Sequence, residues 1–260
     1  MWHELVHTAP LQLGVARTRW TLATLQSGEP VWRRYSLSGF WRLLQALHIH
    51  YKRGRHYVHS PDPDYLSKRA AVQQCVTHAR QRPAQVVTYF LDEFSFYRHP
   101  TVASAWFPAG HDQPRAQRSH RSNIYYRVLG ALNATSGQVV FRMAKATPVA
   151  FICRFLRHLR DTHPDVTDLN VVLDNWYHVH DHPDVQSAAA AAQITLVYLP
   201  SYAPWLNPIE KLWRKAYQEI LHLHRDSDRW SELKQRMQTF LEGFNQPSPG
   251  LLCYVGLLPN

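Results

Sequence analysis

The sequence predicts an α/β protein: a mixed five-stranded sheet with flanking helices, preceded by a small helical arm. Two apolar runs, 86–91 and 169–173, each lead into an aspartate, as buried strands of an α/β sheet often do. Two further β-prone runs, 123–133 and 138–143, flank a Thr-Ser-Gly turn and indicate a hairpin. A last short apolar run, 194–198, completes five strands that are interleaved with helical stretches.

Length and composition fit one main domain with a smaller appendage. The chain has 260 residues, of which 45% are hydrophobic, so a substantial core is possible. The formal net charge of +10 and the pI of about 9.7 favour a polyanionic partner, nucleic acid above all. The three cysteines show no metal-ligand or redox spacing. No apolar run approaches a membrane span and no secretory signal is evident, so we expect a cytoplasmic location and no membrane partner.

The N-terminal arm contains two short helical stretches, 17–25 and 38–47, followed by the basic run 50–55. This order resembles the end of a helix-turn-helix, with one face of the second helix towards a DNA groove and the basic run on phosphates. A small helical cap with a solvated basic loop is the alternative. The candidate DNA contacts are Trp41, Arg42, Gln45, Lys52, Arg53 and Arg55.

Proline-rich segments separate the arm from the sheet and interrupt the sheet itself. The run 59–64 breaks the chain, and 65–80 then predicts a linking helix. After the first strand, 94–121 predicts an ordered loop over the site, anchored by Trp106. Three arginines spaced about three apart in this loop are candidates to line a DNA channel, with a solvated surface loop as the alternative. They are Arg115, Arg118 and Arg121.

The remaining helices follow from apolar periodicity. The sequence predicts helices over 148–160, 183–192 and 230–244, the last packed on the sheet or on another subunit. The end of the chain, 247–260, is too apolar for a free tail. We expect it to dock through Leu251, Leu252, Tyr254 and Leu257.

Three acidic residues are the candidates for chemistry. Asp92 and Asp174 each follow an apolar strand, and they become neighbours if the first and fourth strands pair. Glu210 falls in the first turn of a helix that Asn207 caps and Pro208 opens. Taken alone, Glu210 is equally a first-turn acid that answers the helix dipole.

Carboxylates that converge beside a core call for a cation. An all-oxygen set suits Mg²⁺ or Mn²⁺ better than Zn²⁺. His178, His180 and His182 alternate along an extended segment, but no further residue completes a zinc set, so we expect them to contact DNA or to support Asp174. Asn175 either orients a metal-bound water or, as we prefer, hydrogen-bonds within the Asp174 loop.

Three sequence blocks, LDE, LDNWYHVHDHP and LPSYAPWLNPIEKLW, resemble the signature blocks of DDE transposases of the mariner superfamily, specifically the bacterial insertion-sequence-630 family. The resemblance covers roughly residue 36 to the C-terminus, and NPIEKLW is its most specific part. It implies an RNase H-like fold in which Asp92, Asp174 and Glu210 are catalytic and bind metal, two Mg²⁺ ions per site with Mn²⁺ as a substitute.

The same resemblance implies the function and the partners. It predicts a transposase that binds transposon inverted-repeat ends, cleaves DNA, and transfers the strand into target DNA at TA dinucleotides. It further implies a homodimer on DNA, nucleoid association in a prokaryote and no small-molecule substrate. The alternatives are a catalytically silent, transposase-derived DNA-binding protein and a general RNase H-like nuclease.

The implied domains are a partial helix-turn-helix arm over 1–60, a linker helix over 61–82 and an RNase H-like DDE catalytic domain over 83–260. Full-length members of the family generally carry a longer N-terminal region with one more helix-turn-helix module. We therefore expect either a split or truncated form, or recognition of the DNA ends with less protein.

Overall fold

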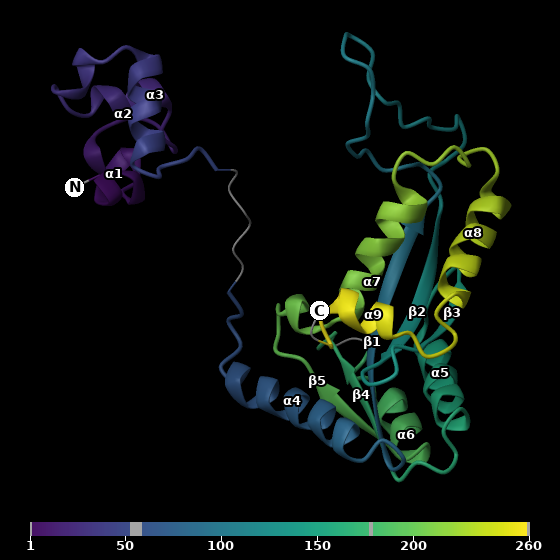
Figure 1. Ribbon diagram of the computed structural model, residues 1–260. Coiled ribbons are helices and arrows are strands. Elements are labelled where there is room, and N and C mark those ends of the chain that lie inside the picture. The colour runs from purple at the N-terminus through teal and green to yellow at the C-terminus, as the bar shows by residue number, and fades with distance from the viewer. Residues whose placement is uncertain (1, 53–58, 177–178, 259–260) are drawn as a thin grey trace. The chain divides into compact units, whose positions relative to one another are not determined.

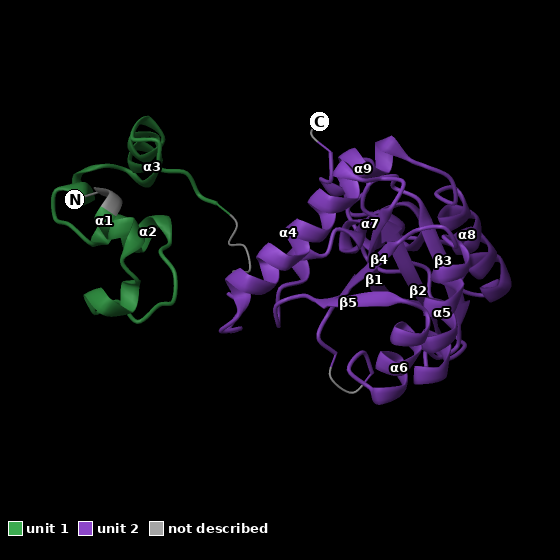
Figure 2. Ribbon diagram, turned by 90° about the horizontal axis from the view of Figure 1, so that it is seen from below, with its two compact units in different colours: residues 1–57 green, residues 58–260 purple. Residues whose placement is uncertain are grey.

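The computed structural model describes residues 2–52, 59–176 and 179–258. The chain forms two compact units, Met1–Tyr57 and Val58–Asn260, called unit 1 and unit 2 below (Figure 2). Within the described ranges each unit has apolar clusters of its own. None of the helices in these ranges is both long and apolar enough to cross a bilayer.

Unit 1 is a small helical body. Its helices are α1 (Trp2–His7), α2 (Leu22–Ser27) and α3 (Leu37–Ala46), with 3₁₀ turns at Pro10–Leu13 and Trp32–Arg34. Its buried core consists of Leu25, Trp32, Phe40 and Leu44. The predicted second helix of the arm is therefore present as α3, while the short α1 was not foreseen.

Local capping explains where these helices begin. The Ser36 hydroxyl accepts a hydrogen bond from the Gly39 amide at 3.1 Å and starts α3. The Thr21 hydroxyl accepts one from the Thr24 amide at 3.2 Å, so α2 begins after it and not at residue 17 as predicted. The helix-turn-helix interpretation of this unit stays a prediction.

Unit 2 is built on one mixed five-stranded sheet (Figure 1). Its order is β3-β2-β1-β4-β5, in which β1 pairs antiparallel with β2 and parallel with β4. The predicted fold class and the pairing of the first and fourth strands are confirmed. The strands are β1 (Val86–Tyr97), β2 (Tyr125–Asn133), β3 (Val139–Ala144), β4 (Asp168–Leu173) and β5 (Ile194–Tyr198).

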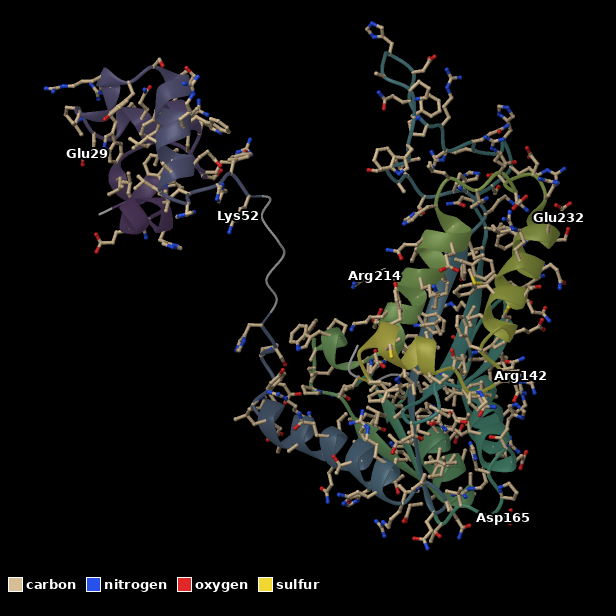
Figure 3. The ribbon with its side chains drawn as sticks, viewed as in Figure 1. Glu29, Lys52, Arg142, Asp165, Arg214 and Glu232 are labelled. Carbon is tan, nitrogen blue, oxygen red and sulfur yellow. The ribbon has the colours of Figure 1, made fainter. Side chains whose placement is uncertain are left out.

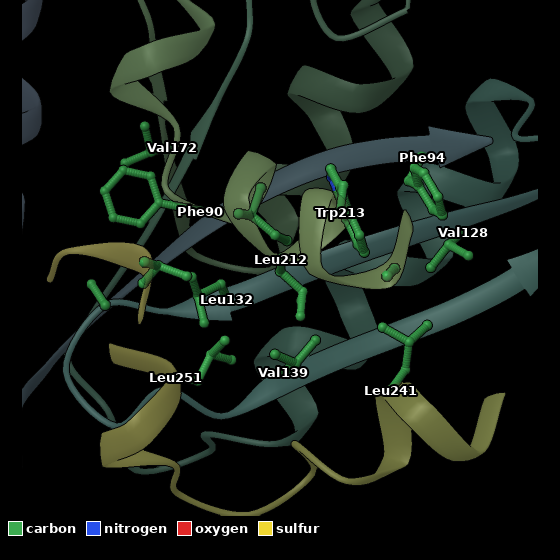
Figure 4. Close-up of a cluster of buried hydrophobic side chains, with 14 of the residues drawn as sticks. Phe90, Phe94, Val128, Leu132, Val139, Val172, Leu212, Trp213, Leu241 and Leu251 are labelled. Carbon is green, nitrogen blue, oxygen red and sulfur yellow. The ribbon is translucent and has the colours of Figure 1, made fainter. Parts of the chain in front are cut away.

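Helices cover both faces of this sheet. One apolar cluster packs α4, α7, α8 and α9 on one face, and a second packs α5 and α6 on the other (Figures 1 and 4). The helices are α4 (Tyr65–Gln81), α5 (Val149–Asp161), α6 (Pro183–Ala191), α7 (Ile209–Ala216), α8 (Trp230–Glu242) and α9 (Pro249–Val255). A π-helical turn, Tyr217–Leu221, continues α7.

The first strand is longer than predicted. We expected it to end on Asp92, but β1 continues to Tyr97 because Phe94 and Phe96 keep the alternating burial of a strand. The antiparallel partner β2 pairs with it along this extension, as far as Tyr97 opposite Tyr125. Asp92 therefore lies inside a strand and faces Gly130 across the β1–β2 pair.

The loop between β1 and β2 does not cover the predicted site. The Thr101 amide donates to the carbonyl of Leu221, and the Leu223 amide donates to the carbonyl of Thr101. The loop is thus tied to the end of the α7 segment, which at 1.5 Å per residue is roughly 16–20 Å from its first turn. Trp106 is fully exposed, so its predicted role as an anchor is wrong.

The end of the chain docks, as predicted, and does so as a helix. Leu251 and Leu252 of α9 are buried, and Leu257 is partly buried against the same cluster. Tyr254 stays 40% exposed and contacts the surface of the α7 segment: its hydroxyl donates to Gln218 at 3.3 Å, and the Lys215 amine lies 5.1 Å from its ring centroid. A helical period places Val255, and not Tyr254, in the buried cluster, so Tyr254 docks at the rim of the core.

Candidate active site

Asp92 and Asp174 occupy equivalent positions on neighbouring strands. The parallel β1–β4 register ends with Phe90 opposite Val172, and each aspartate lies two residues beyond that pair. Because side chains alternate along a strand, each aspartate shares the face of its own member of the pair. Phe90 and Val172 both belong to the cluster that packs under α7. The two carboxylates therefore emerge on the α7 side of the sheet.

The α7 helix brings Glu210 to the same face. Asn207 is buried, and its amide donates to the carbonyl of Leu91 at 3.2 Å, which fixes the start of α7 beside the middle of β1. The predicted capping is wrong in detail: Pro208 occupies the cap position, and the Asn207 side chain bridges to the strand. Glu210 follows in the first turn, with its side chain at the exposed rim.

Burial and neighbouring negative charges raise the pKa of Asp92 and of Glu210. Burial raises the pKa of Asp92 well above its ordinary value, and the charges of Glu210 and Glu93 raise it further. Burial also raises the pKa of Glu210, with a further rise from Asp174 and a smaller, opposing effect of Arg214. The three acids are thus close enough to feel one another, and a cation between them would relieve the repulsion.

A protein donor holds one oxygen of each aspartate. The Trp213 indole N–H donates to Oδ2 of Asp92 at 2.8 Å, and its ring stacks on Phe94 with centroids 5.1 Å apart. Nδ1 of His180 lies 2.6 Å from Oδ1 of Asp174. The other oxygen of each aspartate accepts no hydrogen bond from a described residue, which leaves it available to a ligand.

His180 links the loop that follows β4 to the middle of β1. Its imidazole is fully buried, with Nδ1 on Asp174 and Nε2 3.0 Å from Oε1 of Glu93. Burial lowers the pKa of His180, but the hydrogen bonds to Asp174 and Glu93, with their charges, outweigh that effect and raise it to about 10. Nδ1 also lies 3.1 Å from the backbone carbonyl oxygen of Asp174, so the ring is held between β1 and the Asp174 loop by both of its nitrogens.

The donor set fits a hard divalent cation. Three carboxylates lie on one face of the sheet, and two of them have an oxygen that accepts no hydrogen bond from a described residue. The pKa values of Asp92 and Glu210 are raised first by burial and then by neighbouring carboxylates, which a bound cation would offset. Across residues 2–52, 59–176 and 179–258, no three acid, histidine or cysteine side chains lie close enough together to enclose an ion. The three carboxylates are therefore too far apart to bind one ion together, and they would have to move closer to one another to bind it.

Comparison with known proteins bears on this arrangement. The family model described as DDE superfamily endonuclease matches residues 87–234, more than half of the chain and a span that includes all three acids. The chain belongs to this family. A relative, the insertion element IS630 uncharacterized 39 kDa protein of Shigella sonnei, is 26% identical over 250 residues that cover 95% of this chain and 71% of that protein. The resemblance drawn from the three sequence blocks is confirmed.

Solved structures with the same fold come from mariner transposition. The Mos1 paired-end complex with Mg aligns with a TM-score of 0.64 and 15% identity, covering 92% of this chain and 72% of that one. The Mos1 transposase paired-end complex with left transposon end aligns with a TM-score of 0.60 and 13% identity, covering 96% and 78%. At these identities the likeness establishes the RNase H-like fold of this DDE endonuclease family member.

The predicted DNA contacts are dispersed over both units. Trp41, Arg42 and Lys52 are exposed in unit 1. Gln45 is half-buried, because the left-handed backbone at His48 turns the chain back and places His50 Nδ1 2.6 Å from the Gln45 amide oxygen. In unit 2 the three loop arginines, Arg115, Arg118 and Arg121, are exposed. Two residues of the basic run, Arg53 and Arg55, lie outside the described residues.

Sequence reasoning missed the roles of Glu93 and Trp213. Glu93 and Trp213 lie inside the quoted LDE and NPIEKLW blocks, but nothing in a linear pattern shows that either touches an aspartate or its partner. His180 was one of three candidate supporting histidines, and the structure distinguishes it by its burial. His182 caps α6, and His178 is outside the described residues. Asn175 is exposed, with its amide 3.5 Å from the Ser201 hydroxyl.

Proposed function

We propose that this protein is a transposase that binds transposon-end DNA, cleaves it in a reaction that depends on divalent metal, and joins the strand to target DNA, with TA as the expected target. The observation that carries the proposal is the placement of Asp92 and Asp174 at equivalent positions of adjacent parallel strands, with Glu210 brought to the same face. Membership of the DDE endonuclease family and the likeness to mariner paired-end complexes support it.

In this proposal Asp92, Asp174 and Glu210 would hold Mg²⁺ or Mn²⁺, two ions per site. Bound there, the ions supply Lewis-acid stabilisation of the charge that develops on the attacking and leaving oxygens of a phosphodiester. The protein's own contribution is orientation: Trp213 fixes one oxygen of Asp92, and His180 fixes one oxygen of Asp174. No side-chain nucleophile is needed, since water or a DNA 3′ hydroxyl attacks the phosphorus.

We further propose that unit 1 contributes affinity for the transposon end, with Trp41 and Arg42 towards a DNA groove and Lys52 on phosphates. The exposed side chains and the net charge of +10 support this role. Two subunits would pair two ends, and inside a prokaryote the protein would then be found at the nucleoid.

The test is a supercoiled donor plasmid that carries the inverted repeats flanking the coding region, incubated with Mg²⁺ or Mn²⁺. We expect nicks and double-strand breaks at the repeat ends for the parent protein and none for Asp174→Asn. Asp165→Asn is the matched control, because Asp165 is exposed at the far tip of unit 2 (Figure 3).

Three results would count against the proposal in different ways. Equal cutting by Asp174→Asn and the parent would remove Asp174 from the mechanism. Cutting without regard to the repeats would favour a general RNase H-like nuclease. Binding to the repeats in chelator, with no cutting in any metal, would favour a catalytically silent DNA-binding protein.

A further inference from the structure

A groove with a volume of about 970 Å³ lies between α4 and α7 of unit 2. Arg69 and Gln73 of α4 line it from one side, and Glu210 and Arg214 of α7 line it from the other. Phe90 of β1 contributes to its apolar lining. The groove therefore follows α7 up to a carboxylate of the proposed active site.

The groove is strongly basic, and two of its cations make no hydrogen bond or ion pair with another described residue, although the charge of Arg214 acts on Glu210. Arg80 and Lys211 donate to backbone carbonyls of the segment 255–257 and so hold the end of the chain in place. Arg69 and Arg214 are exposed and make no hydrogen bond or ion pair with another described residue (Figure 3 labels Arg214). With Glu210 as the one acid among its described lining residues, the groove is complementary to a polyanion.

An aromatic side chain lies in the same groove. The Trp205 side chain lines it and is 49% exposed, which is unusual for an indole in a folded domain. Its N–H donates to the hydroxyl of Tyr65, the first residue of α4, at 3.3 Å. This bond ties the ring to the neighbouring helix and leaves a fixed aromatic surface in the groove.

We propose that this groove binds an unpaired stretch of DNA, with phosphates on Arg69 and Arg214 and a base stacked on Trp205. Aromatic faces combined with a cationic groove are how proteins hold single strands. In a duplex the faces of the bases are covered by their stacked neighbours, so a ring such as Trp205 has a partner only where the strand is unpaired. The inference rests on the proposed function. In that function, the groove would lead the end of one DNA strand to Glu210.

The test measures binding of the full chain to fluorescein-labelled dT12 and to a blunt 12-base-pair duplex, in chelator, over a range of salt concentrations. We expect dT12 to bind more tightly than the 12-base-pair duplex. We expect Arg69→Gln/Arg214→Gln to weaken dT12 binding at least ten-fold. The slope of log K against log salt should fall by about 1.4, because each phosphate contact to a single strand contributes about 0.7.

The matched control is Arg154→Gln/Arg157→Gln, which removes the same charge from exposed positions on α5, on the opposite face of the sheet. It should leave the salt slope unchanged. Trp205→Ala should weaken dT12 binding by about 5- to 150-fold with no change in slope, since stacking carries no charge. Equal binding by the groove variants and the control variant, or no binding of dT12 by the parent, would overturn the proposal.

A second measurement uses the unmodified chain and so does not depend on how a variant folds. A dT12 strand with one 5-iododeoxyuridine should photo-crosslink to Trp205 or to a peptide within 65–80 or 202–214. Crosslinks confined to other peptides would contradict the groove assignment.

The outcome is separable from that of the proposed function. Plasmid cutting that is equal in the parent and in Arg69→Gln/Arg214→Gln, with equal dT12 binding, would reject the groove and keep the transposase. If dT12 binding depends on the groove arginines but the parent cuts no plasmid, the groove assignment stands and the transposase proposal is rejected.

Discussion

At the scale of single residues, the candidate site depends on groups that are not themselves the predicted acids. His180 is buried between two carboxylates, and Trp213 donates to a third. These contacts set which oxygen of Asp92 and Asp174 is left for a ligand. The acids were predictable from sequence because each follows a strand or opens a helix, and His180 was among the histidines expected to support Asp174. The contacts of Trp213 with Asp92 and of His180 with Glu93 were not predictable, because those partners are distant in the chain.

Removing the His180 imidazole should be costly. His180→Ala leaves the Glu93 and Asp174 carboxylates facing each other without the cation between them, and we expect a loss of about 2–4 kcal/mol in the free energy of unfolding. Urea denaturation at neutral pH measures it. His182→Ala on the same loop, which loses a half-exposed cap with a single 3.2 Å bond, should lose only about 1 kcal/mol. Equal losses for the two variants would show that His180 does not link Asp174 to Glu93.

At the scale of elements, the sequence predicted five strands, the hairpin and most helices, because apolar periodicity and turn residues fix them locally. The pairing of the first and fourth strands followed from the requirement that Asp92 and Asp174 meet. Prediction failed where a tertiary partner decides. The length of β1 depends on β2, and the start of α7 depends on the Asn207 bridge to Leu91. Trp106 was misplaced for a related reason, since an aromatic in a proline-rich loop is not necessarily buried.

The packing of α7 on β2 can be tested at Gly130. A Cβ there would lie 2.6 Å from Cη2 of Trp213, a rigid ring that is stacked on Phe94 and bonded to Asp92. Gly130→Ala should therefore destabilise the protein by about 1–3 kcal/mol and displace the ring from Asp92. Thermal or urea unfolding measures the first effect.

Gly250→Ala is the control for this prediction, because a Cβ at Gly250 in α9 meets nothing within 4 Å. It should be neutral or slightly stabilising. Combining Gly130→Ala with Trp213→Phe should cost less than the sum of the two single changes, since the smaller ring makes room. Strict additivity would mean that Gly130 and Trp213 do not compete for the same space.

Asp62 attaches the start of α4 to the loop between β5 and α7. Its carboxylate forms an ion pair with Lys68 and accepts a hydrogen bond from the Ser201 amide, both at 2.8 Å. The Lys68 hydrogen bond and then the Ser201 amide lower the pKa of Asp62 to about 2. A depressed pKa stabilises the fold above the unfolded value near 3.9, and this stability is lost as the pH falls towards 2. The melting temperature of the parent should therefore exceed that of Asp62→Asn by a constant amount above about pH 5.

That difference should shrink below pH 4, as followed by scanning calorimetry from pH 6 to pH 2.5. Asp64→Asn is the control, because the Asp64 carboxylate makes no hydrogen bond or ion pair with a described residue. A gap between parent and Asp62→Asn that is the same at pH 2.5 as at pH 6 would rule out the ionised tether.

At the scale of the whole molecule, the basic charge foretold by composition is present in both units, and the fold matches the mariner structures at low identity. The proposed function requires residues 92, 174 and 210 to act as one centre although they are far apart in the chain. The sheet order supplies the first two and the helix that follows β5 supplies the third. Local sequence could indicate each acid but not their final separation.

The most direct test of this convergence is Mn²⁺ binding to the full chain, followed by electron paramagnetic resonance as the loss of the free-ion signal. The account predicts saturable binding by the parent and by Asp165→Asn. It predicts at least ten-fold weaker binding for each of Asp92→Asn, Asp174→Asn and Glu210→Gln, because each removes one charged ligand of a shared site. Parent-like Mn²⁺ affinity in all three variants would contradict it.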